Sequence, residues 1–250
     1  MKNHFSILTT LCFSTAIMTL LLLGCSPSIA ISVSPDNTIS YSFSATIDER
    51  IAGTARSFSG TTEDMPMFNA KKTEQALHDA GLESVTVSLP DSLSLTAKGN
   101  LTIEDTSQQS EILPLVPGAL IFGDTLNTNG LKVKEIKLAL SPETFKQLLR
   151  IIPPETAEYA DLLSAPVLTE ETMSKDEYTE LIAAIYGETA KQALTDSMIS
   201  IAVQVPSQIL SAKVSANGSS SKVSEKKVIF SIPLVDFLIQ TQEIIFCIQF

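Results

Sequence analysis

The stretch Ile39-Ser-Tyr-Ser-Phe-Ser-Ala-Thr-Ile47 alternates without interruption between apolar side chains and small hydroxyl side chains. Because successive side chains of a β-strand point to opposite faces, the apolar set occupies one face of a sheet and the hydroxyl set the other. A strand of this kind is buried on one side only. The stretch therefore predicts a sheet that covers a core with one face and meets water with the other.

The same two-residue period recurs in several further segments, namely Ile31/Val33, Val85/Val87/Leu89, Leu93/Leu95/Ala97, Leu101/Ile103, Ile199–Val205, Val228/Phe230/Ile232 and Ile244–Phe250. Turn signals stand between many of them, at Pro35-Asp36-Asn37-Thr38, Gly99-Asn100, Asn129-Gly130 and Asn217-Gly218. Asn-Gly between strand-like runs is typical of a β-hairpin, and strands joined by hairpins pair antiparallel. We therefore expect a large antiparallel sheet.

Helix signals fall in two parts of the chain. Asn69 can cap a helix over residues 70–80, which Gly81 would end. Ser141-Pro142-Glu143 is typical of a helix start and predicts a helix to residue 152, followed by a second helix over 157–163. Ser174-Lys-Asp-Glu177 has capping-box spacing and predicts a helix that is interrupted at Gly187 and resumes to Leu194.

Together these elements predict an α+β fold, in which a block of helices covers one face of a large twisted antiparallel sheet. We expect a single domain over residues 31–250. The alternative is two smaller lobes that meet near residue 120.

The N-terminal segment, residues 1–25, reads MKNHFSILTTLCFSTAIMTLLLLGC. Lys2 near its start is followed by an apolar stretch, and the segment ends in Leu22-Leu23-Gly24-Cys25, which resembles the lipobox of bacterial lipoproteins. The resemblance implies that residues 1–24 are a cleaved signal peptide and that Cys25 is lipidated, with palmitate among its acyl chains. Residues 25–30 would then be a short tether, and the protein would lie in the bacterial cell envelope, in the periplasm or at the surface. The alternative is an uncleaved transmembrane anchor, since the apolar stretch is nearly long enough to span a bilayer.

The charge balance limits the partners that the protein can bind. The chain has 17 basic and 28 acidic residues, a formal net charge of −11. This balance argues against nucleic acid as a partner, because a phosphate backbone requires a cationic face. It also gives no attraction to anionic headgroups, so we expect the lipid on Cys25 to provide the membrane contact.

Cysteine usage excludes an internal disulfide if Cys25 is acylated. Of the three cysteines, Cys12 would leave with the signal peptide and Cys25 would carry lipid. Cys247 would then be the one remaining thiol. Its strand-like surroundings predict a buried, structural thiol.

The sequence matches no template for a catalytic, metal or cofactor site. After signal cleavage one histidine remains, His78, whereas an HExxH zinc site needs two; a GxSxG nucleophile motif is absent. Gly118 and Gly123 have the glycine spacing of a phosphate loop, but Asp124 stands where lysine belongs. We therefore predict no catalytic residue, no metal and no cofactor, and we do not expect an enzyme.

A resemblance to a lipoprotein group appears in the second half of the chain. A strand runs into Ser141-Pro142-Glu143-Thr144-Phe145, and after the helical block follow Ile199–Val205, the Ala216-Asn217-Gly218 turn and Val228–Leu234. This order resembles LppM-like bacterial lipoproteins, which carry an αβ domain outside the membrane and are suspected of handling lipids. It also resembles small spirochaete lipoproteins. Neither resemblance brings a catalytic motif or a ligand.

The expected function is that of a non-enzymatic, membrane-anchored envelope lipoprotein that binds another envelope protein or has a structural role. An alternative is a carrier of a lipid or another hydrophobic ligand, because aliphatic faces such as Leu181/Ile182/Ile185 and Leu234–Ile239 exceed what one sheet needs. A hydrolase built around His78 is a third possibility.

Overall fold

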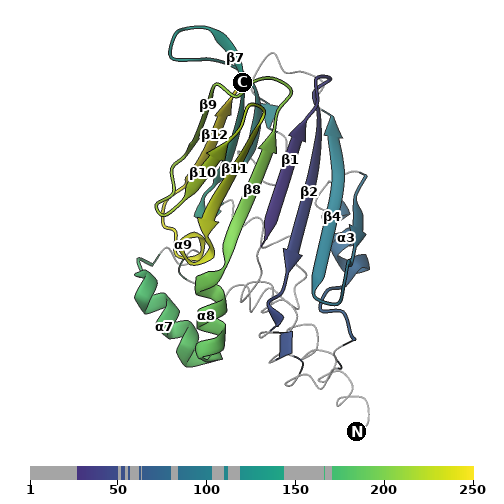
Figure 1. The fold of residues 1–250 in the computed structure, drawn as a ribbon, viewed down its shortest axis with the longest axis vertical. Coiled ribbons are helices and arrows are strands. Elements are labelled where there is room, and N and C mark those ends of the chain that lie inside the picture. The colour runs from purple at the N-terminus through teal and green to yellow at the C-terminus, as the bar shows by residue number, and fades with distance from the viewer. Residues whose placement is uncertain are drawn as a thin grey trace.

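Two β-sheets form the body of the protein in the computed structural model, which describes residues 27–49, 52–53, 56, 62, 64–79, 84–102, 110–111, 119–143, 166 and 171–250 (Figure 1). The seven-stranded sheet has the order β10-β11-β8-β1-β2-β4-β3, with β1 Ser28–Val33, β2 Thr38–Thr46, β3 Thr86–Ser88, β4 Ser94–Thr102, β8 Met198–Gln204, β10 Ser220–Val223 and β11 Lys227–Pro233. The five-stranded sheet has the order β5-β6-β7-β12-β9, with β5 Ser110–Glu111, β6 Leu120–Leu126, β7 Lys132–Leu140, β9 Ser211–Val214 and β12 Ile244–Gln249.

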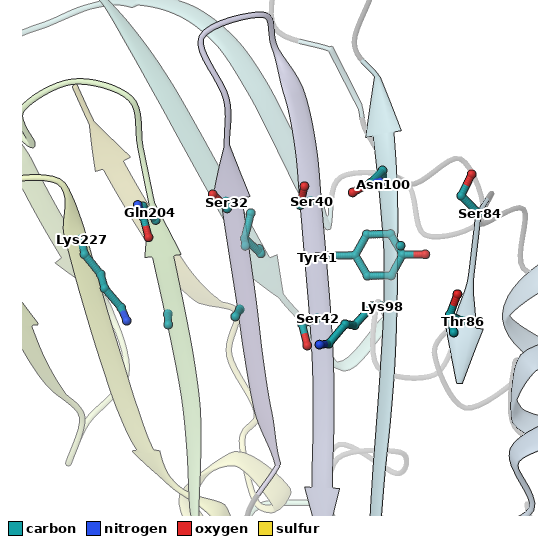
Figure 2. A pocket seen from close by; sticks show the side chains of 14 residues that line it. Ser32, Ser40, Tyr41, Ser42, Ser84, Thr86, Lys98, Asn100, Gln204 and Lys227 are labelled. Atoms are coloured by element: carbon teal, nitrogen blue, oxygen red, sulfur yellow. The ribbon is translucent and has the colours of Figure 1, made fainter. Parts of the chain in front are cut away.

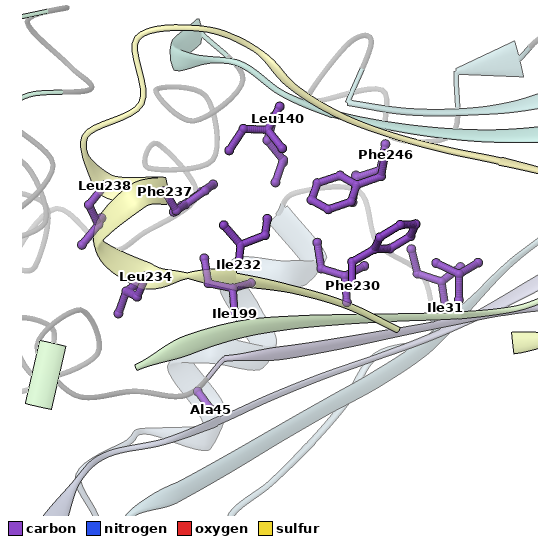
Figure 3. Close-up of a cluster of buried hydrophobic side chains, with 14 of the residues drawn as sticks. Ile31, Ala45, Leu140, Ile199, Phe230, Ile232, Leu234, Phe237, Leu238 and Phe246 are labelled. Carbon is purple, nitrogen blue, oxygen red and sulfur yellow. The ribbon is translucent and has the colours of Figure 1, made fainter. Parts of the chain in front are cut away.

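The core lies between the two sheets and takes the apolar half of each alternating strand. On β12 the alternation is complete, with Ile244, Phe246 and Ile248 buried and the residues between them partly exposed. Phe246 meets Phe230 of β11 edge to face, with ring centroids 5.1 Å apart (Figure 3). These contacts across the interior hold the sheets together, since aromatic and aliphatic burial is the main favourable term in folding.

Three of the described helices lie together at one end of the sheets: α7 Lys175–Tyr186, α8 Glu188–Asp196 and the short α9 Leu234–Leu238 (Figure 1). The predicted capping box is confirmed, because Ser174 Oγ accepts from the Glu177 amide at 3.2 Å and the Glu177 carboxylate accepts from the Ser174 amide at 2.9 Å. The predicted interruption at Gly187 is also confirmed: its φ of 89° separates α7 from α8.

The remaining described helix, α3 Ala70–Asp79, lies beside β3 and follows the predicted cap, with Asn69 Oδ1 accepting from the Lys72 amide at 3.1 Å. The helices predicted over 142–152 and 157–163 fall largely outside the described residues, although Pro142 and Glu143 are helical.

The predicted α+β class and the large sheet are confirmed, with two differences in how the sheet is built. β1 pairs antiparallel with β2 but parallel with β8, so the seven-stranded sheet is mixed rather than antiparallel throughout. Its apolar face is covered by the second sheet, whereas the described helices of the C-terminal half stand at the end (Figure 3). Both differences arise from long-range pairing: strands from before and after residue 120 lie side by side in both sheets, whereas hairpin signals report only on neighbours in sequence.

Two of the predicted hairpin turns are wrong. Gly99-Asn100 lies inside β4, which continues through it, because the missing Cβ of Gly99 leaves room for the ring of Tyr41 on the neighbouring strand. Asn217-Gly218 is a turn, with Gly218 at φ 69°, but its flanking strands belong to different sheets. The Asn129-Gly130 hairpin is confirmed, with Gly130 at φ 75° between β6 and β7.

The predicted tether over residues 25–30 overlaps the first strand. β1 begins at Ser28, which pairs with Ser44 on one side and Ser200 on the other, and the Pro27 carbonyl accepts from the Ser200 amide at 3.0 Å. Only Ser26 and Pro27 therefore stand between Cys25 and the sheet. The Ser/Pro composition of this stretch is typical of a loop, although Ser28 and Ala30 fill outward positions of a strand.

Candidate binding face on the seven-stranded sheet

The outward side of the seven-stranded sheet carries a row of hydroxyl side chains. The pairing registers place one Ser or Thr of every strand in this row, in the order Ser220, Ser231, Ser200, Ser28, Ser44, Thr96 and Ser88. Neighbouring strands are about 4.8 Å apart, so the hydroxyls form a closely spaced line. Two of them touch directly, with Ser28 Oγ and Ser44 Oγ 3.2 Å apart. We call this outward side, with the two rows described next, the hydroxyl face.

Two further rows of the hydroxyl face combine short side chains with lysines. The first runs Lys222, Ile229, Ala202, Ala30, Ser42, Lys98 and Thr86, and the second runs Lys227, Gln204, Ser32, Ser40 and Asn100. The central strands contribute only Ala and Ser, whereas the long side chains stand toward the flanks (Figure 2). This difference in side-chain length leaves a hollow of about 460 Å³ over the middle of the sheet.

Tyr41 is one of the residues that border this hollow, at the boundary between β2 and β4, and the strand register puts its side chain on the side of Ile31 and Gly99. Its ring extends from β2 toward β4 (Figure 2), opposite Gly99, where any Cβ would collide with the phenol. The Tyr41 hydroxyl is buried and makes no hydrogen bond to another described residue. Burial accordingly raises the pKa of this phenol.

The charge of the hydroxyl face differs from that of the whole chain. Its described outward positions include three exposed lysines, Lys98, Lys222 and Lys227, and no acidic side chain, although the chain has a net charge of −11. Within the described residues none of these lysines has an ion-pair partner. Ammonium groups beside hydroxyls and amides can bind a polar anionic group by charge-assisted hydrogen bonds.

The residues singled out from the sequence lie elsewhere. Cys25, the predicted lipidation site, falls outside the described residues. His78 is exposed in the last turn of α3. Asp124 forms an ion pair with Lys132 at 2.8 Å and a longer one with Lys134, and the hydrogen bond from Lys132 lowers the pKa of its carboxyl. Asp124 therefore links β6 to β7 through these ion pairs. Among the described residues, no three His, Cys, Asp or Glu side chains are grouped as a metal site would require.

Cys247 differs from its prediction, because its side chain is half-buried on the outward side of the five-stranded sheet. The thiol donates to the Glu135 carboxylate at 3.3 Å. Burial and this acidic neighbour raise the pKa of Cys247 to about 11, although Lys137 and Lys213 face it across the strands. Sequence reasoning did not connect Cys247 with Glu135, which lies two positions before Lys137 on β7. Glu135 becomes a neighbour of Cys247 only through the register between β7 and β12.

Sequence reasoning identified the polar set on residues 40–46 but missed the hydroxyl face as a unit. Ser40, Ser42 and Ser44 were visible as the outward half of an alternation. The row continues through Ser28, Ser200 and Ser231 because β1 pairs parallel with β8. No local pattern in the sequence indicates this pairing.

The fold and this face define an α+β protein with two facing sheets and a polar, cationic outer surface. No protein-family model matches the chain. No curated protein matches its sequence. Among solved structures it is similar to the folded domain of the LppM protein of Mycobacterium tuberculosis, with 10% identity, a TM-score of 0.36 and 90% of each chain covered. In the parts of the chain that the structure describes, no helix is both long and apolar enough to cross a membrane.

Proposed function

We propose that this protein is a non-enzymatic lipoprotein of the bacterial envelope, anchored through lipid on Cys25, that binds a polar anionic ligand on the hydroxyl face. The observation that carries the binding role is the contrast of charge: three lysines and no acid on the outward positions of one sheet, in a strongly acidic chain. A surface with acidic residues on every face would show no such separation of lysines from acidic side chains. Two of the lysines, Lys98 and Lys227, line the hollow, where a bound group loses part of its hydration and electrostatic attraction increases.

The proposed anchor is compatible with the position of β1. Acylation of Cys25 would attach lipid three residues before the first residue of β1, the central strand, so the body would lie close to the membrane surface. More than one acyl chain is needed for stable attachment, and lipoprotein processing supplies them on the N-terminal cysteine. The anchor leaves the binding role to the folded part of the chain.

The anchor is tested by metabolic labelling with a palmitate analogue, in the parent protein and in Cys25→Ala. We expect label in the parent and none in the variant. Equal labelling of the two, or a purified protein that begins at Met1 without added acyl mass, would contradict the assignment.

The binding role is tested with dextran sulfate as the polyanionic probe and uncharged dextran as its reference, by isothermal titration calorimetry on the full-length protein. Lys98→Gln/Lys227→Gln removes two of the three charges, and Lys71→Gln/Lys72→Gln on the exposed surface of α3 is the matched control. We expect dextran sulfate to bind the parent and the control at low salt, and binding by the first double variant to weaken at least about tenfold. Equal binding by both double variants would refute the assignment.

The carrier alternative depends on an apolar cavity. The aliphatic faces that suggested it are partly used in packing: Ile182, Leu234 and Leu238 are buried in the core. Leu181 and Ile185 of α7 are exposed instead. Native mass spectrometry of the purified protein distinguishes the two functions, since a carrier would retain a co-purified lipid.

A further inference from the structure

The point where the chain enters the sheet determines which end of the molecule would face a membrane. β1 begins at Ser28, and the Pro27 carbonyl accepts from the Ser200 amide at 3.0 Å. Ser200 lies in β8, the strand that follows α8, so the chain enters at the end of the sheets where α7 and α8 stand (Figure 1). Three residues, from Cys25 to Ser28, span at most about 10 Å. Lipid on Cys25 would therefore hold this end of the molecule against the bilayer.

Large apolar side chains are exposed at both ends of the sheets. Of the eight such side chains among the described residues, four lie at the end where β1 begins, namely Met65, Leu181, Ile185 and Met198. Met198 is the first residue of β8, and Met65 lies near the start of β4, because the Met67 amide donates to the Ser92 carbonyl at 2.8 Å. The other four lie at the opposite end, namely Leu126, Leu131, Leu210 and Val223. Exposure alone thus selects neither end, whereas the point of chain entry selects the first, whose four residues we call the end patch.

Two residues of the end patch lie on α7, the longest of the described helices. Leu181 is 43% exposed and Ile185 is 49% exposed. They are four residues apart, so they share one side of the helix. Tyr178 and Ile182 are buried and pack α7 against the body. α7 therefore carries a second apolar stripe beside its buried one, and this second stripe remains open to solvent.

The charges beside this stripe argue against an anionic surface as its partner. Glu180 and Glu188 are exposed and both pair with Lys191, so one ammonium group serves two carboxylates. Two further exposed acids, Asp176 and Glu177, stand in the first turn of α7. These carboxylates give no attraction to anionic headgroups. A contact between this end and lipid would accordingly be apolar.

We propose, on the basis of the anchor proposed above, that the end patch lies in the interfacial layer of the bilayer that holds the lipid of Cys25. Apolar side chains of a surface helix insert to the boundary between headgroups and acyl chains. A patch of this size is a weak membrane ligand by itself, but the tether makes the contact intramolecular and so raises its effective concentration. The contact fixes the orientation of the body: β1 and its neighbours run away from the bilayer, and the hydroxyl face stays open to solvent from the side (Figure 1).

The experiment uses the full-length, processed protein in phosphatidylcholine vesicles that contain brominated phosphatidylcholine as a quencher. The environment-sensitive fluorophore NBD is attached to Ala184→Cys, on the exposed side of α7, or to Thr128→Cys, in the exposed turn between β6 and β7 at the opposite end. Both chains also carry Cys247→Ser, so that the introduced thiol is the one labelled. We expect at least about twofold stronger quenching at residue 184 than at residue 128. High salt should leave the quenching unchanged, because the contact is apolar.

A pair of double variants tests whether the apolar side chains make the contact. In the chain labelled at residue 184, Leu181→Ser/Ile185→Ser should reduce the quenching at least about twofold. The matched control, Leu126→Ser/Leu131→Ser, removes two exposed leucines from the opposite end and should leave the quenching unchanged.

The outcomes separate this inference from the anchor. A protein that incorporates the palmitate analogue and floats with the vesicles, but shows equal quenching at the two positions or no loss in Leu181→Ser/Ile185→Ser, would overturn the contact and leave the anchor intact. A protein that neither incorporates the analogue nor floats with the vesicles would overturn both.

Discussion

The edge-to-face contact between Phe230 and Phe246 connects the two sheets, and its removal should cost a large part of the stability. Phe246 is 1% exposed and Phe230 is fully buried, with ring centroids 5.1 Å apart and an interplanar angle of 65°. A buried Phe→Ala change costs about 3–5 kcal/mol, because apolar contact is lost and a cavity remains. The total stability of a domain is about 5–15 kcal/mol. Phe246→Ala should therefore remove between about a fifth of the margin and all of it.

The measurement is urea denaturation followed by circular dichroism, with the free energy of unfolding taken from the linear dependence on urea. Phe246→Leu, Phe230→Leu and the double variant form a cycle that isolates the contact between the rings. We expect a coupling of about 0.5–1.5 kcal/mol, the usual contribution of an aromatic pair beyond its buried area. The partly buried Phe43 on β2 is not a suitable control, because it also packs against the core. Leu126→Ala, at a position 67% exposed, is the better one.

A loss below about 1 kcal/mol for Phe246→Ala would refute the reasoning. Additive effects of Phe246→Leu and Phe230→Leu in the cycle would also refute it. Either outcome would mean that the two rings do not contact each other. The sheets would then be joined by something other than this part of the core.

Three further changes test other parts of the structure. Gly99→Ala should destabilise the protein by about 1–3 kcal/mol in the same urea assay, because the new methyl group collides with Tyr41, and Tyr41→Ala in the same chain should remove that penalty. Cys247 should react slowly with Ellman's reagent at pH 8 and faster as the pH rises toward about 11, because the thiolate is the reactive form and the pKa is raised. Glu135→Gln should lower that pKa and speed the reaction at pH 8; an unchanged rate would contradict the role of the carboxylate. Deletion of residues 243–250 should prevent cooperative folding, since it removes the strand between β7 and β9 and several buried side chains worth about 1.5–3 kcal/mol each; an unchanged melting curve would show that the strand is peripheral.

The local features of the fold follow from the sequence wherever the signal lies within a few residues. The alternation over 39–47, the capping box at Ser174 and the break at Gly187 each depend on neighbours along the chain, and each is confirmed. The burial of every second residue in β12 follows from the same alternation. These patterns are sufficient to establish the α+β class.

The arrangement of the strands could not be predicted in this way. The β1–β8 pair joins residues that are far apart in sequence, and its parallel direction leaves no trace in either strand. Gly99 was misread because glycine is common in turns, whereas here its missing side chain accommodates Tyr41. The same limitation hid the hydroxyl face, which exists only through the sheet register.

The central place of β1 has a mechanical consequence for a protein held by its N-terminus. A pull on residue 25 would run along the axis of β1, which is hydrogen-bonded along one edge to β2 and along the other to β8. The force would load both ladders in shear, so that many bonds resist together, whereas a strand at the sheet margin could be peeled away one bond at a time. If Cys25 carries the proposed lipid, an anchor attached next to the middle strand of the sheet would let the folded body withstand drag without unfolding from its point of attachment.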